Sequence, residues 1–210
     1  DFTVADAFNE QSTGESAMED SAVSSLVVCD LSGAQLASIC VFDAACSGVT
    51  PQGRTYGGAG TLHTGNLRYR YHISDGQISC DVSSIEVYFP ESDGWQPLDF
   101  HKAYSTSFTF ESSQNLVSLL PWASKMATGQ ALPFAPYDEA TGTYMDVPSD
   151  NKSEEYYRFW APYCRGKGVL EGTSYELKSW TALYYYAASM NGTLSDAYTP
   201  DYLMQTRIQG

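Results

Sequence analysis

The chain has 210 residues, of which 43% are hydrophobic and 17% charged, and its net charge is −14. This composition excludes a disordered chain and a coiled coil, and so acidic a chain repels phosphate, which argues against nucleic-acid binding on its own. No apolar run approaches the ~18 residues that a membrane span needs, so no membrane partner is expected.

The N-terminal part of the sequence is acidic, because eight carboxylates precede the first basic residue, Arg54. Acidic stretches with few aromatic residues rarely pack, so residues 1–22 are predicted to form a solvated, flexible arm. The alternative is an arm that becomes ordered against a neighbouring subunit.

Two apolar runs follow the arm, Ser25 to Cys29 and Leu36 to Phe42, and the turn-like link from Asp30 to Gly33 joins them. Both runs are predicted to be strands. The glycine-rich segment from Val49 to Gly60 is predicted to be a long loop.

The segment from Leu67 to Ile73 alternates strictly between apolar and polar residues. Successive side chains of a strand point to opposite faces, so this pattern predicts a half-buried strand. The outward face would carry the three basic residues Arg68, Arg70 and His72. This basic stripe is interpreted as a solvated face, as a contact with an acidic neighbour, or as a contact with RNA phosphates.

The rest of the chain shows short apolar or aromatic runs that end at turn residues, and they too are predicted to be strands. They are Ile85 to Phe89, Tyr104 to Phe110, Leu116 to Leu120, and one long or two short strands within Tyr175 to Met190. A long loop is expected from Gly129 to Glu155. Short helices are expected at Trp122 to Ala127 and at Pro200 to Met204.

Seven or eight strands with long connections predict an all-β sandwich, of immunoglobulin-like or jelly-roll type. The sandwich would occupy residues 23–199, and residues 200–210 would form a C-terminal tail. No internal repeat and no linker divides the chain.

Few residues suggest chemistry. The sequence has three histidines and lacks HExxH, HxH, GxSxG and phosphate-loop patterns, so no enzyme, metal site or cofactor is predicted. The five cysteines form no CxxC pair and are interpreted as buried free thiols. A Cys–His pair and a pair of carboxylates remain open, although no spacing supports either.

Five segments, in this order, resemble strand motifs in the coat proteins of picorna-like viruses. They are Gly33 to Phe42, Gly65 to Ser74, Ile85 to Glu91, Phe108 to Ser124, where Trp122 replaces the family's tyrosine, and Ala182 to Ala188. The resemblance covers about three-quarters of the chain, from Gly33 to Ser195.

The resemblance implies an eight-stranded antiparallel jelly roll with long loops, in a structural subunit of a small icosahedral RNA virus. It implies release from a polyprotein in the host cytoplasm, a final place in the virion capsid, and other coat proteins as partners. Genomic RNA would be a weak partner, because the acidic charge requires neutralisation by other subunits or by cations. The alternative is a secreted β-sandwich binding module, such as an adhesin or a carbohydrate-binding domain.

Overall fold

The computed structural model describes most of the chain between residues 14 and 189. The described ranges are 14–18, 23–49, 55–57, 65–92, 94–166, 170 and 172–189. The predicted helix at Pro200 to Met204, the tail, residues 1–13 and 19–22 of the arm, and most of the predicted loop from Val49 to Gly60 lie outside these ranges.

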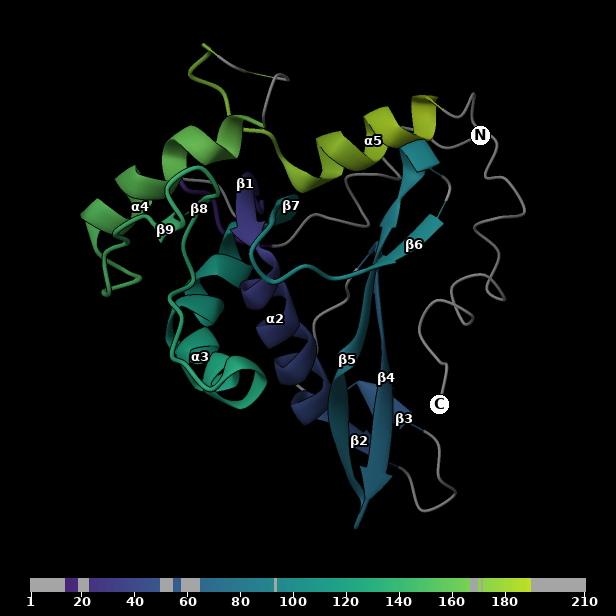
Figure 1. Cartoon of the computed structure of the whole chain (residues 1–210). Helices are drawn as coiled ribbons and strands as arrows, with labels where there is room; N and C mark the ends of the chain where they lie inside the picture. Colours follow the sequence, from purple (N-terminus) through teal and green to yellow (C-terminus); the bar gives the residue numbers. More distant parts are fainter. Residues whose placement is uncertain are drawn as a thin grey trace. The chain divides into compact units, whose positions relative to one another are not determined.

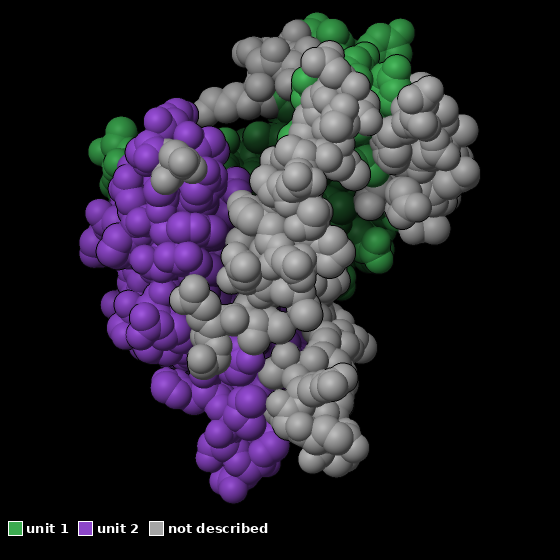
Figure 2. Space-filling view, turned by 90° about the vertical axis from the view of Figure 1, so that its right-hand side faces the viewer, with its two compact units in different colours: residues 1–31, 103–118, 134–197 green, residues 32–102, 119–133, 198–210 purple. Residues whose placement is uncertain are grey.

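The chain divides into two compact units, each built from segments that are far apart in sequence (Figure 2). Unit 1 consists of residues 1–31, 103–118 and 134–197, and unit 2 of residues 32–102, 119–133 and 198–210. The predicted all-β jelly-roll sandwich is wrong: within the described ranges the chain is mixed, with four α-helices and small separate antiparallel sheets.

The strands of unit 2 form one antiparallel sheet in the order β3–β2–β5–β4, and β6 pairs with β5. Their bounds are β2 Ser47–Val49, β3 Thr55–Gly57, β4 Leu67–Ser74, β5 Gln77–Phe89 and β6 Gly94–Pro97, with a 3-10 turn, η1, at Pro90–Ser92. The strands predicted at Leu67 to Ile73 and Ile85 to Phe89 are confirmed as parts of β4 and β5, and Pro90 ends β5 as expected.

A two-residue turn joins β4 to β5. Asp75 and Gly76 have φ angles of 52° and 76°, and Ser74 pairs with Gln77 across the turn. An Asp-Gly pair with both φ angles positive is the favoured turn of a two-residue hairpin, because its twist matches that of the strands.

Helix α2, Gly33–Cys46, packs against this sheet (Figure 1). Ala37 and Cys40 of the helix form a buried core with Ile85 of β5, and Leu67 and Tyr69 of β4 pack against that core. The predicted strand at Leu36 to Phe42 is therefore wrong. Nearly all of that run is buried, and a continuously apolar run has no periodicity that separates a strand from a helix.

A capping box begins α2. The Ser32 hydroxyl accepts a hydrogen bond from the Gln35 N–H, and the Gln35 side chain accepts one from the Ser32 N–H. Only glycine fits at position 33, because an added Cβ would lie 2.0 Å from the main-chain oxygen of Asp99. These contacts satisfy N–H groups that the first helical turn would otherwise leave unpaired.

We expect Ser32→Ala to lower the free energy of unfolding by about 1 kcal/mol, the usual cost of losing an N-cap hydroxyl. Urea unfolding followed by circular dichroism measures the change. Ser118→Ala, which removes an exposed hydroxyl inside a helix, is the matched control and should leave stability nearly unchanged. An unchanged midpoint for Ser32→Ala would contradict the capping role.

Unit 1 combines short strands with helices, and one helix continues into unit 2. The elements are β1 Leu26–Ser32, β7 Ala103–Thr109, α3 Phe110–Thr128, β8 Tyr137–Asp138, β9 Thr143–Tyr144, α4 Glu154–Trp160, the 3-10 helix η2 Ala161–Arg165 and α5 Ser179–Ser189. β1 pairs with β7, and β8 pairs with β9. The strands predicted at Ser25 to Cys29 and Tyr104 to Phe110 are thus confirmed as β1 and β7, although β1 ends three residues later than predicted and each other end differs by one residue. A small hairpin, β8–β9, interrupts the loop predicted from Gly129 to Glu155.

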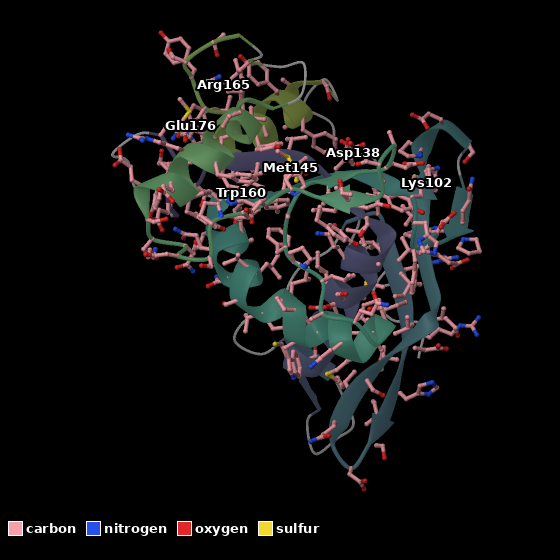
Figure 3. All side chains as sticks on the ribbon, turned by 60° about the vertical axis from the view of Figure 1, so that its left-hand side comes forward. Lys102, Asp138, Met145, Trp160, Arg165 and Glu176 are labelled. Carbon is pink, nitrogen blue, oxygen red and sulfur yellow. The ribbon has the colours of Figure 1, made fainter. Side chains whose placement is uncertain are left out.

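An aromatic cluster fills the core of unit 1. Trp160, at the end of α4, is fully buried, and its ring lies 5.8 Å from that of Phe108 and 5.9 Å from that of Phe134 (Figure 3). The buried rings of Phe110 and Tyr156 lie 5.9 Å apart in the same unit. These separations suit edge-to-face and tilted aromatic packing, which stabilises the unit beyond simple burial.

Helix α3 corrects a second expectation. The run from Leu116 to Leu120, predicted as a strand ended by Pro121, is helical, and Pro121 lies inside the helix. Proline in a helix interior costs about 3 kcal/mol. Burial of Leu116, Leu120 and Ala123 along one side of α3 offsets that cost. The helix predicted at Trp122 to Ala127 is confirmed as part of α3.

Helix α5 corrects a third expectation, the strands predicted within Tyr175 to Met190. The aromatic residues there favoured strands by composition, but the segment shows no strict alternation of apolar and polar residues. Ala182, Leu183, Ala187 and Ala188 are strong helix formers and continue the helix between the tyrosines.

Candidate interaction surfaces

Helix α5 is apolar and yet lies at the surface of unit 1. It has no charged residue, and Ser179 is its only buried residue. Trp180, Leu183 and Tyr184 are half-buried, and Tyr185 and Tyr186 are exposed. A helix without charges is ordinarily buried in a core or against a partner.

The first turn of α5 is anchored to unit 1. The Ser179 N–H donates to the main-chain oxygen of Ser24 at 3.1 Å, and Ser25 forms an isolated antiparallel β-bridge with Lys178. The remaining turns present tyrosine rings to solvent, with 63% of Tyr185 exposed. Tyrosine and tryptophan are enriched at protein–protein interfaces, so the exposed side of α5, which carries Tyr185 and Tyr186, is a candidate interaction surface.

Sequence reasoning missed this surface because it assigned the segment to strands inside a sandwich. A signal was present: residues 177–195 contain no aspartate or glutamate, although the chain has 25 acidic residues. The stretch carries four aromatic residues and no acid, which favours a surface kept free of repulsive charge, although longer acid-free stretches occur at residues 44–74 and 112–137.

The basic stripe lies on β4, where Arg68 is partly buried and Arg70 and His72 are exposed. The Arg68 Nε donates to Glu86 Oε2 at 2.7 Å, and its guanidinium lies 4.3 Å from the centre of the Trp95 ring. Arg68 is therefore already compensated by a carboxylate and a ring face.

Asp81 lies opposite Arg70 across the hairpin. Hydrogen bonds from Ser83, together with the nearby charges of His72 and Arg70, hold the pKa of the Asp81 carboxyl below its ordinary value, against a smaller desolvation effect. The stripe is thus flanked by carboxylates on β5, and the contact with RNA phosphates stays a prediction.

A buried ionic cluster ties residues 14–18 to the rest of unit 1. The side chain of Glu176 is 0% exposed and that of Lys178 is 12% exposed, and Lys178 Nζ lies 2.5 Å from Glu176 Oε2. The Ser16 hydroxyl donates to the same oxygen at 2.5 Å, and the Met18 N–H donates to Oε1 at 2.6 Å.

Burial alone would raise the pKa of Glu176. The hydrogen bonds from Lys178, Ser16 and Ser25 outweigh burial, so the pKa of Glu176 lies below its ordinary value. The carboxylate is ionised in the folded protein, and its role is to hold the chain near Ser16 in place.

Glu15 makes a second tie in the same segment. Lys152 Nζ donates to Glu15 Oε2 at 3.0 Å, and the Tyr157 hydroxyl donates to Oε1. Ser16 and Ala17 are buried, so residues 14–18 of the predicted flexible arm are packed in unit 1.

The cysteines are all free, and Cys29, Cys40 and Cys164 are buried, as predicted for those three. Burial raises the pKa of the Cys29 and Cys80 thiols to about 12. Thiols with raised pKa values are poor nucleophiles and poor metal ligands. In the part of the chain that the structure describes, no group of three or more metal-ligating side chains comes together, and no helix is both long and apolar enough to cross a membrane.

No protein-family model matches this chain, and no curated protein and no solved structure matches it either.

Proposed function

We propose that this chain is a structural subunit of a larger protein assembly, and specifically a coat protein of a small icosahedral RNA virus that assembles with other coat proteins. The observation that carries the proposal is α5, an uncharged helix whose tyrosine face lies at the surface of a strongly acidic chain. Burial of one large apolar side chain contributes about 1.5–3 kcal/mol to association before ordering costs.

The order of motifs in the sequence supports the specific form of the proposal. Two of the five motif segments fall on paired strands: Gly65 to Ser74 includes β4, and Ile85 to Glu91 includes the last five residues of β5. The other three include parts of α2, α3 and α5. The coat-protein proposal therefore rests on motif order and on the α5 surface, since the jelly roll that the resemblance implied is wrong.

The secreted binding module has less support, because the β-sandwich that it implied is wrong, as the jelly roll is, and no order of motifs favours it. Asn151, Lys152 and Ser153 form an Asn-x-Ser triplet, the acceptor pattern for glycosylation in secreted proteins. The Asn151 Nδ2 donates to the main-chain oxygen of Gln114 at 2.6 Å. A glycan would replace one of the two hydrogens on this nitrogen, which leaves a single N–H for that hydrogen bond.

The test compares assembly of the purified chain with that of two variants, alone and mixed with the other structural proteins of its native source. Tyr185→Asp introduces a charge into the α5 surface, and Met145→Asp introduces the same charge at another exposed apolar residue of unit 1. We expect wild-type protein and Met145→Asp to enter particles seen by electron microscopy, and Tyr185→Asp to stay outside them.

Circular dichroism of each variant verifies that it folds. A wild-type chain that remains monomeric at every concentration and never enters a particle would contradict the proposal. Equal incorporation of both variants would contradict the role of α5.

A further inference from the structure

Helix α3 carries a second apolar stripe besides the one that packs in the core. Leu119, Trp122 and Met126 are 38%, 51% and 59% exposed. Leu116, Leu120 and Ala123, on the neighbouring side of the helix, are buried. The exposed residues, called here the α3 seam, belong to unit 2.

The spacing of the α3 seam is that of a helix-pairing interface. Its members are separated by three and then four residues, the alternation that keeps apolar side chains on one line along two paired helices. A face of this kind packs more closely against one further helix than against a flat or irregular surface.

The charges of the segment that carries the α3 seam indicate which molecule supplies the further helix. Residues 112–137 contain no aspartate or glutamate, and Lys125 is their only charged residue. Two copies of a chain with a net charge of −14 repel each other wherever carboxylates meet. No carboxylate follows Glu111 in α3, so the helix itself brings none to a contact along the α3 seam.

The seam is also self-complementary in an antiparallel arrangement. When two copies of α3 cross between Trp122 and Ala123, Leu119 of each copy faces Met126 of the other, and the two Trp122 rings lie side by side. The two Lys125 residues, one from each copy, then lie on opposite sides of the crossing point. Such a pairing is two-fold symmetric and closes on itself.

We propose that two copies of this chain form an antiparallel dimer through the α3 seam. The dimer goes beyond the proposed shell function, because it uses unit 2 and a contact between identical chains. It does not depend on α5, so the Tyr185→Asp variant is expected to dimerise like the wild type.

The first experiment is sedimentation equilibrium of the isolated full chain over a concentration series. Trp122→Glu is expected to weaken dimerisation about tenfold or more, because it places a carboxylate at the centre of the seam. Ile73→Glu, the same change at an exposed apolar residue of β4, is the matched control and should dimerise normally. Thermal unfolding shows that both variants are folded.

A second experiment tests the register. Leu119→Lys and Met126→Glu are each expected to dimerise poorly alone, whereas an equimolar mixture should recover dimers, because the introduced lysine faces the introduced glutamate. A wild-type chain that stays monomeric, a dimer that Trp122→Glu leaves intact, or a mixture that recovers nothing would each overturn the antiparallel seam.

Discussion

Replacing Trp160 by alanine should lower the free energy of unfolding by about 3–5 kcal/mol, the range for truncating a fully buried large aromatic side chain. The indole is 0% exposed, and the rings of Phe159 and Tyr163 lie 5.2 Å and 5.7 Å from it. Alanine would leave a cavity that the rigid neighbouring rings cannot fill. Denaturant unfolding, followed by near-ultraviolet circular dichroism, measures the loss.

Trp122→Ala is the matched control for this prediction, because Trp122 is half exposed on α3. At concentrations where the chain is monomeric, that change should cost far less than the change at Trp160. Equal losses at the two tryptophans would mean that the aromatic cluster is not the packed core of unit 1.

Replacing Glu176 by glutamine should cost about 3–5 kcal/mol at neutral pH, because it leaves the largely buried ammonium of Lys178 without its carboxylate. Glu154→Gln, which removes an exposed ion pair with Arg158, is the control and should change stability little. A cost for Glu176→Gln as small as that of the control would contradict the structural role of the buried cluster.

The same variant makes a prediction about pH. The pKa of Glu176 is lowered by folding from its ordinary value of 4.5, so its stabilisation is fully present above that value and is lost as the pH falls through the lower, folded-state pKa. The stability difference between wild type and Glu176→Gln should therefore shrink below pH 4.5. Unfolding curves measured at a series of acidic pH values show whether the two proteins converge, and a constant difference would contradict the ionised state.

The two strands of the β4–β5 hairpin could be predicted from sequence, but the burial of β4 could not, because Ile73 of the predicted inward face is 47% exposed and Arg68 of the outward face is partly buried. The alternation from Leu67 to Ile73 has a period of two, which only a strand satisfies, and Pro90 marks where β5 ends. The Asp75-Gly76 dipeptide between the two strands is also a sequence signal for a two-residue hairpin turn. Local chemistry is sufficient to place the strands and the turn because their positions depend on immediate neighbours.

Three helices, α2, α3 and α5, were predicted wholly or partly as strands for different reasons, and α4 was not predicted at all. The run that forms the middle of α2 is buried on all sides, so its pattern carries no period, and the decisive signal was the pair Ser32 and Gln35 three residues apart. Pro121 suggested an end in the middle of α3. The tyrosines of α5 favoured strands by composition alone.

The candidate surfaces were only partly predictable. The basic stripe was found from alternation, but its compensation by Glu86 and Asp81 depends on the register of β4 against β5, including the shift between Arg68 and Arg70. The α3 seam has a helical spacing that the sequence displays once the segment is known to be helical. Which of the two stripes of α3 is buried depends on packing within the folded chain.

The sequence by itself determined the acidic character of this protein, its acid-free aromatic stretches and the hairpin around Tyr69, because these depend on composition and on neighbouring residues. The tertiary structure alone decided that the apolar runs become helices and that Ser16 meets Glu176 across 160 positions of sequence. The helix propensities of ordinary residues differ by less than about 1 kcal/mol per residue, whereas burial of a large side chain contributes more. Packing therefore overrides the local preference of a segment for helix or strand. It was packing, too, that left α5 and the α3 seam at the surface.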